Sequence, residues 1–89
     1  MKRKELTKRE LDVMKCIING MSNKQIAEEL IISIHTVKAM IESIYFKLNV
    51  HSRVQAAIKV INEGIFIYDE KTEEFINTKS QITNIKKIK

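Results

Sequence analysis

The stretch Asn23–Leu48, NKQIAEELIISIHTVKAMIESIYFKL, decides how this chain folds. It predicts a short helix over 23–30, a tight break, and a longer helix over about 34–48. Aliphatic residues recur on one side of the longer helix at spacings of four, three and four: Val37, Ile41, Ile44 and Leu48. The opposite side is small and polar: His35, Thr36, Lys38, Ala39, Glu42 and Ser43. Such a helix fits a DNA major groove, and it equally fits an ordinary amphipathic surface helix.

The composition describes one small folded domain with a modest preference for an anionic partner. Its 89 residues are 44% hydrophobic and 30% charged, which favours a folded chain with a single core. Sixteen Lys and Arg residues against eleven Asp and Glu residues give a net charge of +5. A basic excess of this size favours nucleic acid as a partner without requiring it.

Several classes of function find no support in the residues. Cys16 is the only cysteine, so the chain can form no intramolecular disulfide and no Cys-based zinc site, and we expect its thiol to be buried. Neither His35 nor His51 has a carboxylate at metal-binding spacing, and there is no glycine loop for phosphate. We therefore expect no enzyme, no cofactor and no metal. The sequence has no apolar run of transmembrane length and no secretory h-region, which predicts a cytoplasmic protein without a membrane partner.

Capping residues predict four helices. Thr7 with Glu10, Ser22 with Gln25, and Ser52 with Gln55 have the capping-box spacing, and Ser33 caps the helix over 34–48. The first helix should run over about 8–19 and the fourth over about 53–63. Left-handed residues should end the first and third helices, at Gly20 and Asn49, and Gly64 should end the fourth. The second helix ends at Ile31 and Ile32 without Gly or Pro, so we expect this turn to be held by burial of both side chains.

The fourth helix is apolar on two sides. One side carries Val54, Ala57, Ile58 and Ile61. The other side carries Ala56 and Val60. A helix this short in a small protein rarely buries both sides internally, so one side is a candidate subunit interface. The alternative is a wide stripe that faces the core.

The pattern changes after Gly64. Residues 65–68 and 74–77 favour strands, and residues 69–72 between them are rich in turn formers. They predict a small hairpin, which is marginal unless it packs on something. The end of the chain, ITNIKKIK, is compatible with a frayed helix or a basic tail, and Met1–Lys4 forms a basic arm. We divide the chain into a domain over 1–67 and an extension over 68–89.

Four sequence features occur in a characteristic order. They are residues 6–10 (LTKRE), residues 20–27 (GMSNKQIA), Ser33 with residues 36–38 (TVK), and residues 47–56 (KLNVHSRVQA). In this combination the chain resembles the LuxR/GerE-type helix-turn-helix domain, the DNA-binding module of many bacterial transcription regulators, including the NarL/FixJ response regulators. The resemblance covers about residues 5–67. It implies an all-α, four-helix domain, followed here by an extension that holds a hairpin or a tail.

The resemblance also implies roles for individual residues. It implies a sequence-specific regulator of transcription that places the helix over 34–48 in the major groove of duplex DNA and forms a homodimer on DNA through the helix over 53–63. Base-facing positions match Lys38, Ala39 and Glu42. Positions near phosphates match Asn23, Lys24, Thr36 and Arg53. The dimer interface would be built from Val54, Ala57, Ile58 and Ile61, and RNA polymerase is a further candidate partner.

Three departures from the family pattern bear on sequence preference. Met40 stands where relatives often have His, Glu42 where some have Lys, and Ser43 where Asn is frequent. The alternative function is therefore a helix-turn-helix module that has lost DNA readout and acts by dimerising or by docking on another regulator. Relatives usually carry a receiver or ligand-binding domain as well. Met1 followed by a basic arm favours a stand-alone regulator over an excised output domain.

Overall fold

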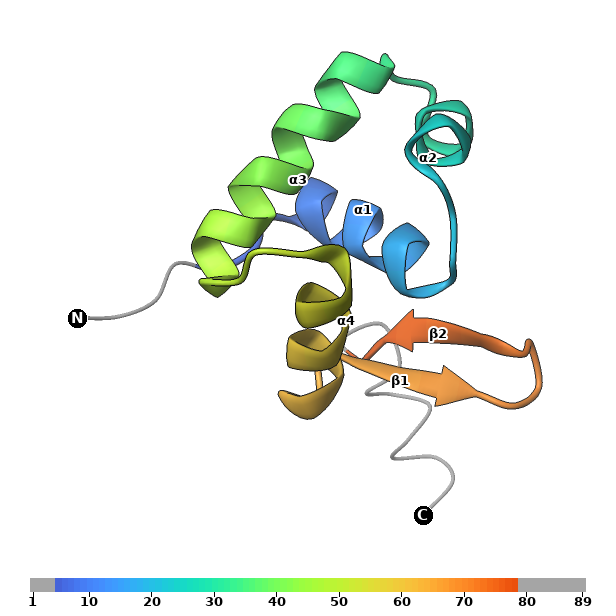
Figure 1. The fold of residues 1–89 in the computed structure, drawn as a ribbon. Coiled ribbons are helices and arrows are strands. Elements are labelled where there is room, and N and C mark those ends of the chain that lie inside the picture. Colours follow the sequence, from blue (N-terminus) through green and yellow to red (C-terminus); the bar gives the residue numbers. More distant parts are fainter. Residues whose placement is uncertain (1–4, 79–89) are drawn as a thin grey trace.

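The computed structural model describes residues 5–78 as four helices followed by a two-stranded hairpin (Figure 1). The helices are α1 (Lys8–Ile18), α2 (Asn23–Leu30), α3 (Ile34–Leu48) and α4 (Arg53–Asn62), and the strands are β1 (Phe66–Asp69) and β2 (Glu74–Asn77). The predicted all-α, four-helix domain with a small C-terminal hairpin is confirmed, and every predicted helix boundary lies within one residue. The predictions for the basic arm and for the end of the chain lie outside the described residues.

The core lies where α1 meets the other three helices and the hairpin. In Figure 1, α3 runs along one side of α1, and α2 lies across from the upper end of α3. The helix α4 and the hairpin lie below α1. The buried apolar residues come from all four helices and from β1: Val13, Met14, Cys16, Ile17, Ile26, Val37, Ile41, Ile44, Leu48, Ala56, Val60 and Phe66. The Cys16 thiol is buried as predicted, and this burial raises its pKa. No helix within residues 5–78 is both long enough and apolar enough to cross a membrane.

Side-chain caps start the helices. The Thr7 hydroxyl accepts from the Glu10 amide at 3.1 Å while the Glu10 carboxylate accepts from the Thr7 amide at 2.8 Å. Ser22 and Gln25 form the same reciprocal pair, at 3.2 and 2.8 Å. At α4 only half of the predicted box forms. The Ser52 hydroxyl caps the Gln55 amide, but the Gln55 carboxamide accepts from the amide of His51 at 2.7 Å, one residue before the expected donor.

All four helices end in the same way. A residue with positive φ follows each helix, and the amide of the next residue returns to a carbonyl in the last turn. The residues that end the helices in this way are Gly20, Ile31, Asn49 and Gly64. Only Ile31 is unsuited to this position, because a β-branched side chain crowds the backbone in the left-handed conformation.

The prediction that the turn after α2 is held by two buried isoleucines is wrong for Ile31. Its side chain is 89% exposed, and only Ile32 packs against the core. Backbone hydrogen bonds hold the turn instead. The Ile32 amide donates to the Ala27 carbonyl at 3.0 Å, and the Arg9 guanidinium donates to the Leu30 carbonyl at 2.9 Å. Arg9 thus satisfies a carbonyl at the end of α2 that the helix itself leaves without a donor.

The hairpin is anchored to α1 and to the core. Its strands pair antiparallel, with Tyr68 opposite Phe75 and their rings edge to face at 5.3 Å. Phe66 is fully buried in the core. The Asn19 carboxamide, at the end of α1, donates to the Phe75 carbonyl at 3.0 Å and accepts from the Phe75 amide at 2.7 Å. This pairing supplies the support that a lone hairpin lacks.

The strain at Ile31 can be tested by substitution. We expect Ile31→Asn to raise the free energy of unfolding by about 1 kcal/mol, because Asn tolerates the left-handed conformation and the exposed Ile side chain contributes little packing. For a domain of this size that gain corresponds to roughly 4–8 °C in Tm, measured by thermal denaturation. Ile31→Val is the control, since it keeps the branched side chain. Equal stability of the Asn and Val variants would contradict the strain.

Candidate nucleic-acid interface

The outer face of α3 is an exposed helical surface that bears polar side chains. Its core stripe is buried as predicted: Val37, Ile41, Ile44 and Leu48. The opposite face is exposed and is made of His35, Lys38, Ala39, Glu42 and Phe46. We call these five residues the outer face of α3. All three predicted base-facing residues lie on it, and among residues 5–78 Glu42 has no hydrogen-bonding or ionic partner. Sequence reasoning had left Phe46 out.

The first turn of α3 is tightly capped. The Ser33 hydroxyl accepts from the Thr36 amide at 3.0 Å, and the hydroxyls of Ser33 and Thr36 lie 3.0 Å apart. Both residues are exposed. The Thr36 hydroxyl, predicted to lie near a phosphate, is therefore already engaged with the cap. The exposed amide end of the helix still provides partial positive charge for an anion.

Two of the predicted phosphate residues bind each other. The Arg53 guanidinium, at the start of α4, donates to the Asn23 side-chain oxygen and to the Met21 carbonyl, the latter at 3.1 Å. Both Arg53 and Asn23 are half-buried, whereas Lys24 beside them is exposed. Arg53 therefore joins the start of α4 to the start of α2. The structure brings together Asn23, Lys24 and Arg53, and their contact with phosphate stays a prediction.

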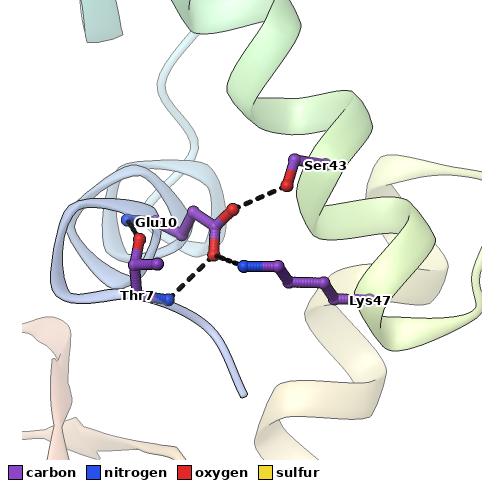
Figure 2. Close-up of polar contacts among 4 residues, drawn as sticks. All are labelled: Thr7, Glu10, Ser43 and Lys47. Atoms are coloured by element: carbon purple, nitrogen blue, oxygen red, sulfur yellow. Dashed lines mark hydrogen bonds and ion pairs between the residues drawn. The ribbon is translucent and has the colours of Figure 1, made fainter. Parts of the chain in front are cut away.

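A buried carboxylate fixes the rotation of α3 (Figure 2). Glu10 is only 6% exposed, and its two oxygens receive the Ser43 hydroxyl at 2.7 Å and the Lys47 ammonium at 2.8 Å. The prediction that Ser43 lies on the outer side of α3 is wrong, because its hydroxyl turns toward Glu10 on α1. Ser43 and Lys47 are four residues apart, so they share one flank of the helix. That flank faces α1, which leaves the outer face turned away from it.

The surroundings of Glu10 favour its charged form. Burial raises the pKa of Glu10, but the hydrogen bonds from Lys47, the Thr7 amide and Ser43, with the charge of Lys47, outweigh it and leave the pKa below its ordinary value. The sequence offered one explanation for Glu10, the capping box, and that explanation is correct. The contact of Glu10 with α3 was not predicted. The available signal was the spacing of Ser43 and Lys47, which lie one turn apart on that helix.

The two sides of α4 have different surroundings. Ala56 and Val60 are buried in the core. The residues predicted to form a subunit interface lie on the other side, where Val54 is 67% and Ile58 is 53% exposed, Ile61 is exposed and Ala57 is half-buried. The alternative of one wide core-facing stripe does not hold, because three of these four side chains are open. The contact of these side chains with a second subunit stays a prediction.

Metal ligands do not gather in the described part of the chain. Among residues 5–78 no group of three or more His, Cys, Asp or Glu side chains could hold an ion. His35 and His51 are both exposed, and they lie on different elements, α3 and the loop before α4.

Comparison with known proteins agrees with this geometry. Residues 4–60 match the family pattern described as "Bacterial regulatory proteins, luxR family". This match spans more than half of the chain. The chain belongs to the luxR family of bacterial regulatory proteins. The hairpin lies beyond the matched residues.

Relatives in the family are longer proteins. A nitrate/nitrite response regulator protein homolog from Haemophilus influenzae is 55% identical over 53 residues, which are 60% of this chain and 26% of that protein. NarP, a nitrate/nitrite response regulator of Escherichia coli, is 52% identical over 58 residues, which are 65% of this chain and 27% of NarP. The crystal structure of the response regulator ChrA from a heme-sensing two-component system aligns with a TM-score of 0.68 and 34% identity, over 72% of this chain and 32% of ChrA. The chain thus spans between a quarter and a third of each of these proteins.

The carboxylate between α1 and α3 predicts an acid dependence of stability. Folding lowers the pKa of Glu10 below its ordinary value of 4.5. The contribution of the Glu10 charge to the free energy of unfolding is therefore fully present above pH 4.5, and it is lost as the pH falls through the lower pKa of the folded state. We expect Glu10→Gln to lower the free energy of unfolding at pH 7 by about 1–3 kcal/mol, since the Lys47 ammonium loses its charged partner. The difference from wild type should shrink as the pH falls below 4.5.

Denaturant titrations at several pH values between neutral and acid measure this effect. Glu70→Gln is the matched control, because Glu70 is an exposed carboxylate in the hairpin turn. It should leave the free energy of unfolding close to that of wild type throughout. A Glu10→Gln deficit that is the same at every pH would show that the charge of Glu10 is not what stabilises the contact.

Proposed function

We propose that this protein is a sequence-specific, double-stranded DNA-binding regulator of transcription that places α3 in the major groove. The observation that carries the proposal is the outer face of α3, which is exposed along its whole length while the opposite stripe and the Glu10 contacts hold the helix in one rotation. A major groove admits an α-helix and offers donors, acceptors and methyl groups to such a face. Membership of the luxR family of bacterial regulatory proteins supports the same function.

Lys38, Ala39 and Glu42 are the proposed base-facing residues. Lys38 is an exposed donor suited to guanine acceptors, and the Ala39 methyl is suited to a thymine methyl. Glu42 lies four residues after Lys38, so the two side chains point into the same groove. A carboxylate is repelled by phosphates, yet it can accept a hydrogen bond from a cytosine amino group.

Phosphate contacts are proposed for residues at the starts of α2, α3 and α4. Lys24 is an exposed cation in the first turn of α2, and Thr36 lies in the capped first turn of α3. Arg53 and Asn23 are proposed to contact phosphate as a joined pair, since the guanidinium retains N–H groups beyond its two internal bonds. Such contacts position the protein on the duplex without reading its sequence.

The exposed side of α4 is proposed to pair with a second copy of the chain on DNA. Val54, Ile58 and Ile61 present an apolar strip to solvent, and half-buried Ala57 lies among them. Two copies joined there would present two α3 helices to two half-sites. The protein would act where its DNA lies, in the cytoplasm, and RNA polymerase is a further proposed partner. The competing function is a module that docks on other regulators without reading DNA, and Glu42 and Met40 are the residues that favour it.

Salt dependence separates DNA binding from protein docking. We expect wild type to bind duplex DNA with an affinity that falls steeply with salt, because bound phosphates release counterions. Lys24→Ala should weaken binding to selected and random duplexes alike and flatten the log–log salt dependence by about one unit. Lys71→Ala is the control, because Lys71 is an exposed lysine of the hairpin turn. It should change neither the affinity for DNA nor the slope of the salt dependence. Failure of wild type to bind any duplex at low salt would contradict DNA binding and favour the competing function, docking on other regulators.

Glu42 can be tested by selecting binding sites from a random library. If its carboxylate accepts from a cytosine, Glu42→Ala should relax the preference at one base pair, by roughly 1–3 kcal/mol, and raise nonspecific affinity. Glu28→Ala, an exposed acid on α2, is the control for the loss of one negative charge. A consensus unchanged at every position, with binding stronger on all sequences, would mean that Glu42 only repels the backbone.

Assembly can be tested at Ile58. We expect Ile58→Asp to abolish cooperative binding to a duplex with two half-sites, because a carboxylate would be buried without a partner at the subunit interface. Ile67→Asp on the hairpin is the matched control, since Ile67 is also an exposed isoleucine. Circular dichroism should show both variants folded. Unchanged cooperativity in Ile58→Asp would remove this side of α4 from the interface.

A further inference from the structure

Phe46 is an aromatic side chain with no place in the core. It is 81% exposed, although it belongs to α3, which buries four other apolar residues. Of the large apolar side chains on this helix, only Ile34 is also exposed, at 37%. The family resemblance assigned Phe46 no role, and neither the hairpin nor α4 covers it.

The position of Phe46 on the helix is defined by its neighbours. Ala39 and Phe46 are seven residues apart, or about two turns, so they lie almost on one line parallel to the helix axis, roughly 10 Å apart. Glu42 lies between them on the same outer face. The neighbouring flank of α3 carries Ser43 and Lys47, whose hydroxyl and ammonium groups donate to the Glu10 carboxylate at 2.7 and 2.8 Å. Phe46 therefore points away from the core, in the direction that Ala39 and Glu42 point.

The chemistry of the groove narrows the choice of ligand. In the major groove the apolar group that a side chain can meet is the C5 methyl of thymine, and Phe is a residue type that contacts it. Base pairs rise about 3.4 Å along the duplex axis, and a helix that follows the groove runs obliquely to this axis. A separation of roughly 10 Å along α3 therefore corresponds to about two to three base-pair steps. Phe46 would then lie over a base pair at the far end of the contacted sequence.

We propose that Phe46 is a further specificity-determining residue, which packs against the C5 methyl of a thymine about two to three base pairs from the base that Ala39 faces. This proposal rests on the proposed function, with α3 in the groove. It adds a contact at the end of α3 that the base-facing set of Lys38, Ala39 and Glu42 lacks. The continuity of Phe46 with that set is what favours DNA over a protein surface as its partner.

The experiment uses the full chain and a duplex recovered from a random library by wild type. Each thymine of the duplex is replaced in turn by deoxyuridine, which lacks only the C5 methyl. We expect one replacement that lies beyond the base facing Ala39 to weaken wild-type binding about fourfold, the loss expected for one buried methyl group. Phe46→Ala should weaken binding to the unmodified duplex at least as much, and it should be insensitive to that one replacement.

Controls separate this role from others. Ile67→Ala, on the hairpin, should keep the wild-type response to every replacement, and thermal denaturation should show Phe46→Ala as stable as wild type, because the side chain is exposed. Identical deoxyuridine profiles for Phe46→Ala and wild type would overturn the proposal while leaving the proposed function intact. So would a loss of cooperativity in Phe46→Ala without any change in profile, which would place Phe46 at a protein contact. Failure of wild type to recover any consensus would overturn both.

Discussion

The Glu10 carboxylate is the interaction on which the presentation of α3 depends. It closes the first turn of α1 through the Thr7 amide and then reaches across to Ser43 and Lys47, residues 33 and 37 positions later in the chain. Burying a charge is costly unless every lone pair that faces the protein finds a donor, and here three donors converge. The apolar stripe of α3 would tolerate small rotations about the helix axis. The directional contacts from Glu10 narrow that range, so the apolar stripe selects the open side of α3 and the carboxylate holds its rotation.

Local structure could be predicted from the sequence because its causes are local. Caps such as Ser22 and left-handed residues such as Asn49 act over three to five residues, and the helices they bound agree with the structure to within one residue. Ile31 shows where this reasoning ends. An isoleucine after a helix suggests burial, but the turn is held by a guanidinium from α1, 21 residues earlier, which no local pattern reveals.

The candidate site was predictable in outline for a similar reason. The period of the apolar residues on α3 determines which side is open, so Lys38, Ala39 and Glu42 are exposed as their spacing requires. The same period misplaced Ser43, because a residue on the flank of a stripe can turn either way. The partner that decides, Glu10, lies on another helix. Likewise, the pairing of Arg53 with Asn23 joins two helix starts that are 30 residues apart.

The hairpin changes what counts as the end of the folded unit. The family pattern stops at residue 60, yet Phe66 fills part of the core and the Asn19 carboxamide at the end of α1 is matched to the backbone of Phe75. A fusion protein that contained only the four helices would therefore have a cavity beside α4, and the Asn19 carboxamide would lack its hydrogen-bonding partner. The portable unit of this chain is set by packing and extends through β2, beyond the motif that identifies the family.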